Sequence, residues 1–248
     1  MNKVILITGG SRGIGAATAV AAARKGFDVC INYLKNEHAA AKTVAAVKRE
    51  GRSAVAIRAD VSEPAEVNRL FAELDKKFDR LDGLVNNAGI LETQMKVLEM
   101  APDRLARVFS ANVFSTFYCS IEAVRRMSTL NGGNGGSIVN LSSVASRTGS
   151  PNEYVDYAAA KGAVDTFTIG LAKEVAAEGI RVNAVRPGFI YTDIHASGGE
   201  PGRVDRVKEM VPMKRGGHPG EVANAIVWLL SDEASFTSGS FIDVAGGR

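Results

Sequence analysis

The chain has 248 residues, of which 46% are hydrophobic and 23% charged, as is typical of a globular protein with a sizeable core. Its formal net charge of +3 comes from scattered basic pairs rather than from a continuous stripe, which argues against nucleic-acid binding. The two cysteines and three histidines are far apart in the sequence and match no disulfide framework or metal motif. The apolar run at 4–7 is too short for a signal peptide or a membrane span. We therefore expect a metal-free cytoplasmic protein with no membrane partner.

Strands and helices are predicted to alternate along the whole chain. This alternation indicates a single-domain Rossmann-type α/β fold over 1–248, a doubly wound parallel sheet of about seven strands with helices on both faces. The expected strands are 3–7, 28–32, 53–59, 81–87, 136–143, 180–185 and 240–244. The expected helices are 13–26, 37–51, 63–78, about 102–130, a stretch ending near 178, and 219–232. The glycine-rich segment 191–218 lacks clear periodicity, and it is either a substrate lid or an irregular surface loop.

The first strand is joined to the first helix by the glycine-rich turn TGGSRGIG at 8–15. In doubly wound folds this turn lies at the carboxyl edge of the sheet, where ligands bind. Glycine allows the backbone to approach a pyrophosphate closely, and the helix start offers free N–H donors. The spacing departs from GxGxxG, but the strand–turn–helix context predicts a dinucleotide site, with a tight turn that binds nothing as the alternative.

The run EYVDYAAAK at 153–161 contains two tyrosines and a lysine. Tyr157 and Lys161 are four residues apart, so on a helix they lie one turn apart on the same face. Tyr154 would be about 10 Å from Lys161 along the axis. A nearby ammonium lowers a phenol pKa from its usual value near ~10, which favours acid–base catalysis at neutral pH. We therefore expect Tyr157 to do the chemistry; the alternative is two exposed residues on an amphipathic helix.

The end of the second strand indicates which nicotinamide cofactor is bound. An NAD site usually places an acidic residue there to bind the ribose 2′-hydroxyl. Here Asn32 and Tyr33 occupy that place, Arg12 lies in the glycine turn, and Lys35 follows the strand. Two cations without a carboxylate favour a 2′-phosphate, so we expect NADP(H) rather than NAD(H). The alternative is that Arg12 and Lys35 face solvent.

Motifs in a fixed order carry a family resemblance: TGxxxGIG at 8–15, NNAG at 86–89, a serine after the fifth strand, YxxxK at 157–161 and RPG at 186–188. Together they resemble the short-chain dehydrogenase/reductase family over essentially the whole chain, and bacterial members described as glucose-1-dehydrogenase-like or 3-oxoacyl-ACP-reductase-like in particular. The resemblance implies an enzyme that moves a hydride between a nicotinamide and a carbonyl or secondary alcohol, in a homotetramer. The substrate would be a sugar, polyol or small ketone, with an acyl-carrier-protein-linked ketone as the main rival.

The resemblance also implies site residues. Ser143 would polarise the substrate oxygen, Tyr157 would exchange the proton, Lys161 would hold the nicotinamide ribose, and Asn112 would support a water-linked proton path from Lys161. Because these four positions are filled, the alternative of a non-catalytic NADP(H) sensor is disfavoured. Ser142 would be structural or a secondary cofactor contact. The expected cofactor contacts are Gly9, Ser11, Arg12, Gly13, Ile14, Gly15, Asn32, Tyr33, Lys35, Asp60, Val61, Asn86, Ala88, Gly89, Tyr157, Lys161, Pro187, Gly188, Ile190 and Thr192, while Asn87 could instead tie neighbouring strands together.

Overall fold

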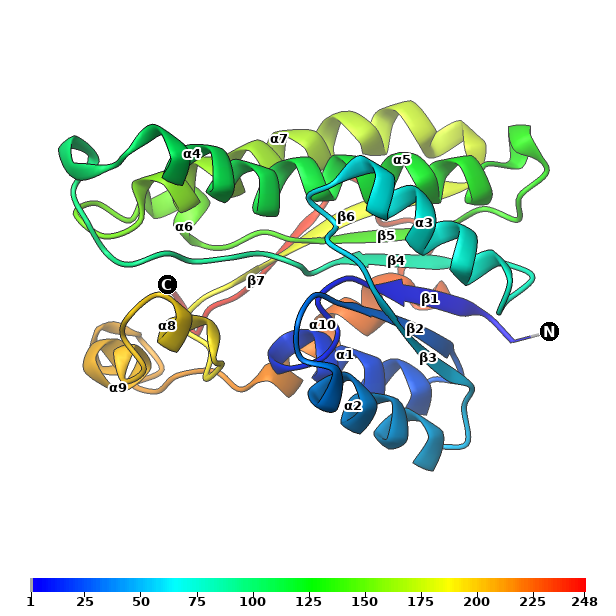
Figure 1. Cartoon of the computed structure of the whole chain (residues 1–248), viewed down its shortest axis with the longest axis horizontal. Coiled ribbons are helices and arrows are strands. Elements are labelled where there is room, and N and C mark those ends of the chain that lie inside the picture. The colour runs from blue at the N-terminus through cyan, green and yellow to red at the C-terminus, as the bar shows by residue number, and fades with distance from the viewer. Residues whose placement is uncertain (1) are drawn as a thin grey trace.

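The computed structural model describes residues 2–248 of the chain. Within these residues, seven strands form one parallel sheet in the order β3-β2-β1-β4-β5-β6-β7 (Figure 1). The chain starts in the middle of the sheet, adds β2 and β3 on one side, and then crosses over to add β4 and its successors on the other. This reversal confirms the predicted doubly wound α/β fold. The strands are β1 (Val4–Ile7), β2 (Asp28–Tyr33), β3 (Ala54–Arg58), β4 (Gly83–Asn86), β5 (Gly136–Leu141), β6 (Ile180–Pro187) and β7 (Phe241–Val244).

Helices cover both faces of this sheet (Figure 1). On one face lie α1 (Gly13–Arg24), α2 (Glu37–Arg49) and α10 (Pro219–Leu230). On the other face lie α3 (Pro64–Asp75), α4 (Pro102–Phe109), α5 (Ser115–Met127) and α7 (Val155–Val175), with the short α6 (Ala145–Thr148) leading into α7. Most predicted elements occur with ends shifted by a few residues, as expected because helix and strand ends fray.

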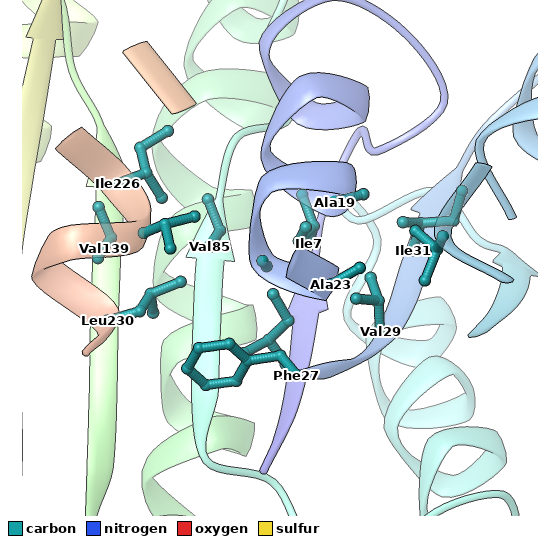
Figure 2. Close-up of a cluster of buried hydrophobic side chains, with 14 of the residues drawn as sticks. Ile7, Ala19, Ala23, Phe27, Val29, Ile31, Val85, Val139, Ile226 and Leu230 are labelled. Atoms are coloured by element: carbon teal, nitrogen blue, oxygen red, sulfur yellow. The ribbon is translucent and has the colours of Figure 1, made fainter. Parts of the chain in front are cut away.

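Alternate residues of the central strands enter two separate cores. Ile7 and Val85 pack with Ile226 of α10 in one core (Figure 2). Leu6 and Leu84, their chain neighbours, belong to the core on the opposite face. Successive side chains of a strand point to opposite faces, so a sheet covered on both faces needs strands that are apolar throughout. This requirement explains the short, unbroken apolar run of β1, which is buried at every position.

The helix predicted over 102–130 is interrupted by a π-helical segment, Ser110–Phe114, between α4 and α5. In this segment the buried Asn112 side chain donates to the Val108 carbonyl, and the Ser115 hydroxyl donates to the Ala111 carbonyl. Polar side chains that bond to preceding carbonyls compete with the regular helix ladder, and π-helical turns often occur at functional sites. Apolar periodicity alone did not reveal this interruption.

The segment 191–218, hereafter the lid, follows β6 and forms two short helices, α8 (Ile194–Ser197) and α9 (Arg203–Val207). It lies at one end of the sheet, close to the C-terminal residues (Figure 1). Across the described residues, no helix is both long and apolar enough to cross a membrane. Residues 2–248 also contain no group of three histidine, cysteine or acidic side chains arranged to hold a metal ion.

Candidate active site

A cleft of about 920 Å³ opens at the carboxyl edge of the sheet. The segments that follow β1, β2, β3, β4, β5 and β6 all contribute to its lining, together with α7 and the lid. Because the carboxyl ends of parallel strands meet at one edge, the topology by itself gathers these distant segments. The cleft brings together nearly all of the sequence-predicted site residues. The lining includes Gly9, Ser11, Arg12, Gly13, Ile14, Asn32, Tyr33, Lys35, Asp60, Val61, Ala88, Gly89, Asn112, Ser143, Tyr157, Lys161, Pro187, Gly188, Ile190 and Thr192.

The glycine turn has the geometry of an anion-binding loop. Gly9 and Gly13 have φ values of +61° and +56°, a backbone region that other residues rarely adopt. Helix α1 begins at Gly13, its first turn contains no acidic residue, and the Arg12 side chain does not cap it. The first amides of α1 therefore remain available at the cleft, which fits the pyrophosphate of a dinucleotide. Gly15 does not line the cleft, contrary to expectation; a Cβ atom there would lie 2.5 Å from the Gly9 carbonyl oxygen, so this glycine allows close packing of helix against turn.

The two asparagines at the end of β4 have different surroundings. Asn86 is buried, and its side-chain amide donates to Asn140 and Ser120 inside the protein, so it does not line the cleft. Asn87 lines the cleft and donates to the carbonyls of Thr8 and Gly9, at 2.8 and 3.0 Å. Asn87 is therefore the residue that ties β4 to the glycine turn, as one of the two sequence interpretations held. The structure therefore does not place the Asn86 side chain in the cleft, because alternation along β4 directs it into the core.

Asn32, at the end of β2, also holds the backbone in place. Its Oδ1 accepts from the Gly9 amide at 3.3 Å, and its Nδ2 donates to the Ala59 carbonyl at 2.9 Å. The side chain therefore links the glycine turn to the segment after β3. Among the two cations expected to recognise a 2′-phosphate, Arg12 lies 3.9 Å from Asp193 of the lid, and both side chains are well exposed. Lys35 lines the cleft beside them.

Tyr157 and Lys161 lie on α7 with their side chains on one face. Lys161 is 4% exposed, and its Nζ donates to the Leu141 carbonyl at 2.7 Å and lies 5.5 Å from the centre of the Tyr157 ring. Ser143 lines the cleft with Tyr157 and Lys161, and its side chain acts to lower the pKa of the Tyr157 phenol. Ser142, by contrast, donates to the Lys161 carbonyl and so attaches the end of β5 to α7. The catalytic residues implied by the family resemblance thus converge at one place.

The pKa values of Tyr157 and Lys161 differ from the expectation that the ammonium lowers the pKa of the phenol. Burial raises the pKa of the Tyr157 phenol to about 12, although the Ser143 side chain opposes this rise. Burial also lowers the pKa of the Lys161 ammonium to about 8, against the attraction of Asp165. Removing water disfavours the charged form of each group, and here this effect outweighs the expected lowering of the Tyr157 pKa by Lys161. Tyr157 is therefore a neutral phenol at neutral pH in this structure, which is the form that can donate a proton.

Asn112 places a further polar side chain in the cleft, near Lys161. Its Nδ2 donates to the carbonyls of Ile90 and Val108, whereas its buried Oδ1 has no partner within residues 2–248. A Cβ atom built on Gly89 would lie 2.5 Å from this Oδ1 and 3.7 Å from Lys161 Nζ, so only glycine leaves room beside the two groups. A buried acceptor without a partner calls for a water or ligand donor. This arrangement fits the expected role of Asn112 next to Lys161.

Sequence reasoning raised the possibility of a lid at 191–218 but named none of the residues that line the lid end of the cleft. Its lining includes Glu153, Tyr154, Phe189, His195, Arg203 and Arg248. Tyr154 is 2% exposed, its hydroxyl donates to the Gly198 carbonyl at 3.4 Å, and the Arg203 guanidinium lies 4.8 Å from its ring centre. Tyr154 therefore holds the lid, while Tyr157 faces the polar groups of the site. Glu200 is followed by Arg203 three residues later and by Arg206 six residues later. This spacing of opposite charges was the available sequence signal for a lid held by ion pairs.

Comparison with known proteins shows the family. The family model described as "Enoyl-(Acyl carrier protein) reductase" matches residues 9–248. The chain belongs to the short-chain dehydrogenase/reductase family. Like other members of this short-chain dehydrogenase/reductase family, it is an NAD(P)-dependent oxidoreductase that acts on CH–OH groups.

Relatives within this short-chain dehydrogenase/reductase family cover the chain from end to end. The chain is 58% identical over 245 residues to "Uncharacterized oxidoreductase YgfF" of Escherichia coli K12, covering 99% of each. It is 39% identical to a 3-oxoacyl-[acyl-carrier-protein] reductase of Synechocystis, covering 99% of this chain and 96% of the relative. A Burkholderia cenocepacia short-chain dehydrogenase in complex with NADP superposes with a TM-score of 0.91 at 32% identity, covering 99% and 97%. Acetoin dehydrogenase from Enterobacter cloacae superposes with a TM-score of 0.88 at 36% identity, covering 100% and 95%.

Proposed function

We propose that this protein is an NADP(H)-dependent reductase and dehydrogenase of small ketones and the matching secondary alcohols, sugars and polyols included. The observation that carries the proposal is the convergence of Ser143, Tyr157 and Lys161 in a cleft that continues to an uncapped glycine turn. An acid–base phenol and a dinucleotide cradle are together the requirements of carbonyl reduction by a nicotinamide. Neither requirement alone would distinguish a catalyst from a nucleotide-binding protein.

The chain's own residues supply binding and proton transfer. Bound NADPH would supply the hydride from its nicotinamide ring. The Tyr157 phenol donates its proton to the carbonyl oxygen during reduction and takes it back during alcohol oxidation. The Ser143 hydroxyl hydrogen-bonds the same oxygen and orients it toward Tyr157. Lys161 would hold the nicotinamide ribose, and Asn112 Oδ1, which has no partner among the described residues, would accept from a water that replenishes the proton through Lys161.

The preference for NADP(H) rests on charge at the end of β2. Arg12 and Lys35 line the cleft, and residues 32–36, at and just after the end of β2, include no acidic residue. A guanidinium can bind a 2′-phosphate through two parallel hydrogen bonds, whereas a ribose hydroxyl needs an acceptor. The structural neighbour from Burkholderia cenocepacia, which was solved with NADP, supports this choice. Arg12 would exchange its exposed contact with Asp193 for the phosphate, since exposed ion pairs contribute little.

Two substrate classes are supported by relatives. Structures of acetoin dehydrogenases from Enterobacter cloacae and Salmonella typhimurium superpose on the chain, which favours a small ketone or alcohol. The second candidate is a 3-oxoacyl chain on acyl carrier protein, favoured by the Synechocystis relative of that name. A carrier protein would need a positively charged surface at the cleft mouth to bind its acidic helices. Steady-state rates with both classes of substrate and NADPH distinguish the candidates.

The decisive test is coenzyme-linked turnover with a tyrosine variant. We expect oxidation of small secondary alcohols with NADP⁺ at a kcat/KM well above that with NAD⁺. Tyr157→Phe should lower kcat by about a hundredfold to ten-thousandfold, the range of general acid–base contributions, while NADPH binding measured by fluorescence stays intact. Wild-type turnover in Tyr157→Phe, or NADPH binding without oxidation of any alcohol or reduction of any ketone, would overturn the proposal.

We also propose that the protein is a homotetramer. Exposed apolar side chains gather on α4, the π-helical segment, α5 and α7: Leu105, Phe114, Phe117, Ile121 and Ile169. Large apolar side chains exposed on neighbouring helices are typical of surfaces that another copy of the chain covers. Light scattering coupled to size exclusion should give four times the chain mass, and Phe117→Glu should shift it to a smaller species. A monomer at micromolar concentration contradicts the proposal.

A further inference from the structure

The lid carries a buried histidine, His195, to which the proposed mechanism gives no part. This residue lies in α8, is 8% exposed and lines the cleft. Its Nε2 lies 3.0 Å from the carbonyl oxygen of Ile190, whereas its buried Nδ1 has no partner within residues 2–248. Because a carbonyl oxygen can only accept, Nε2 must carry a proton. Burial lowers the pKa of this imidazole, against the effect of the Ile190 carbonyl, so the ring is neutral near pH 7 and Nδ1 is unprotonated.

The carbonyl of Ile190 depends on this histidine for a good donor. The residues on either side of Ile190 form two backbone hydrogen bonds with Gly217, both 2.9 Å long, and these leave the Ile190 carbonyl for other partners. The Thr192 hydroxyl also donates to it, but at 3.4 Å, which is longer than usual for such a bond. Ile190 is 4% exposed, so losing the His195 donor would leave its carbonyl poorly paired in a buried place. The contact therefore fixes this part of the chain.

The chain that follows Ile190 leads along the cleft to the glycine turn. Ile190, Thr192 and Asp193 all line the cleft. A Cβ atom built on Gly13 would lie 3.4 Å from Thr192 Cγ2, and the Asp193 carboxylate lies 3.9 Å from the Arg12 guanidinium. Residues 190–193 therefore end beside the uncapped start of α1, where we propose that the pyrophosphate binds. A change in their position would alter the part of the cleft that takes the cofactor.

We propose that His195 is a positioning residue for the cofactor: its Nε2–H group fixes the Ile190 carbonyl and so holds residues 190–193 in place for NADP(H) binding. This proposal rests on the proposed oxidoreductase function and adds to it a residue that acts through its neighbours. The groups proposed for proton transfer belong to α7 and to the end of β5, not to the lid. Loss of the His195 donor should therefore weaken cofactor binding and leave the chemical step intact.

Three variants separate the hydrogen bond from the bulk of the side chain. His195→Leu removes the donor but fills much of the same space. His195→Gln retains an N–H donor at the end of the side chain, where it can replace Nε2. The control is Ala196→Leu, which adds a leucine to the exposed side of the same helix at a residue that does not line the cleft.

The first readout is the dissociation constant of NADP⁺, measured by isothermal titration. His195→Leu should raise it by about threefold to tenfold, the range for one neutral hydrogen bond. His195→Gln should restore the wild-type value, Ala196→Leu should not change it, and kcat at saturating NADP⁺ should stay the same in all three. An unchanged dissociation constant in His195→Leu, a His195→Gln variant that binds as weakly as His195→Leu, or a fall in kcat as large as the loss of affinity would overturn the proposal.

Two measurements without nucleotide separate this proposal from the oxidoreductase function. Long-range ¹⁵N–¹H spectra of the wild type, with the His195 signals identified by their loss in His195→Gln, should show a ring protonated at Nε2; a ring without that proton would overturn the proposal. Hydrogen exchange over 189–193 should become severalfold faster in His195→Leu and stay at the wild-type rate in His195→Gln. Wild-type protein that binds no NADP⁺ would overturn the proposed function, while these two measurements would still decide whether His195 holds residues 190–193.

Discussion

The two sides of the cleft are held by different kinds of interaction. The fixed wall, formed by α4, α7, the π-helical segment and the β4–α4 connection, is joined by buried groups. Arg104 and Asp156, which are 3% and 4% exposed, form an ion pair at 2.7 Å, and Arg104 also donates to the Thr93 carbonyl. Asp156 in turn accepts from the Tyr157 amide at 2.9 Å. The lid, by contrast, is joined to the segment before α7 by ion pairs of Glu153 with the buried Arg203 and with Arg206, which is half exposed.

This difference suits two separate needs: the reacting groups must stay in position, and the substrate must be able to enter. Buried hydrogen-bonded pairs keep reacting groups within a narrow range of positions, because breaking them leaves an uncompensated charge in the core. Exposed ion pairs contribute little and are screened by salt, so the contacts made by the half-exposed Arg206 can open at lower cost than those of the wall. We infer that the wall fixes Tyr157 and Lys161, while the lid admits and covers the substrate.

The wall should be most sensitive to loss of one member of its buried ion pair. Arg104→Met leaves Asp156 buried and charged, so the free energy of unfolding should fall by about 3–5 kcal/mol. Arg104→Met/Asp156→Leu removes both charges and should regain much of this loss. Urea denaturation followed by circular dichroism measures the two variants. A single variant as stable as the wild type would show that the pair does not hold the wall.

Space beside Asn112 is the next most sensitive feature of the wall. In Gly89→Ala the new Cβ would lie 2.5 Å from Asn112 Oδ1, which is buried and has no room to retreat. If Asn112 and Lys161 move by about 1 Å to relieve this clash, kcat should fall by about a hundredfold.

The matched control for this change is Gly170→Ala on the exposed side of α7. A Cβ atom at Gly170 would meet nothing within 4 Å, so this variant should keep wild-type kcat and gain about 0.5–1 kcal/mol of stability. Equal kcat values for the two glycine variants would mean that the space beside Asn112 is not required.

The protonation state of Tyr157 provides a test of the wall's electrostatics. Burial raises the pKa of Tyr157 to about 12, so its proton is retained as the pH rises through the usual range for phenols near ~10. The ultraviolet phenolate signal of wild type minus Tyr157→Phe should therefore be flat up to about pH 10 in the protein without nucleotide. A transition near neutral pH would instead show that Lys161 controls the phenol.

The lid should show the smallest effect on stability and the clearest effect on local motion. Glu200→Gln removes the lid carboxylate paired with Arg203 and Arg206, so hydrogen exchange over 194–207 should become severalfold faster, with little change in global unfolding. Glu66→Gln, which breaks an exposed ion pair on α3, is the control and should leave this segment unchanged.

The contacts of Glu200 with Arg206 and Gln94 also depend on pH in a defined way. Hydrogen bonds from Arg206 and Gln94 lower the pKa of Glu200 from 4.5 to about 2. A lowered pKa in the folded state means that the contact is complete above pH 4.5 and is lost as the pH falls toward 2. Exchange in the lid of the wild type should therefore approach that of Glu200→Gln only at strongly acidic pH; a lid that loosens near pH 6 would assign the contact to another group.

The sequence determined the fold and most of the site because their signals are local. The apolar run of β1, the glycine turn and the spacing of Tyr157 and Lys161 each follow from the geometry of one strand, one turn or one helix. The order of these elements then predicted the parallel sheet and its carboxyl-edge site, and the structure confirms the sheet.

Tertiary structure decided what depends on the surroundings of a side chain. Only packing showed that Asn86 is buried while Asn87 lines the cleft, and that Gly15 serves helix packing. Burial, a property of the whole fold, raises the Tyr157 pKa that local spacing alone predicted to fall. The pairing of Arg203 with Glu153, fifty residues away in sequence, likewise has no local signal. Local geometry is encoded in neighbouring residues, whereas burial and long-range charge depend on elements that meet only after folding.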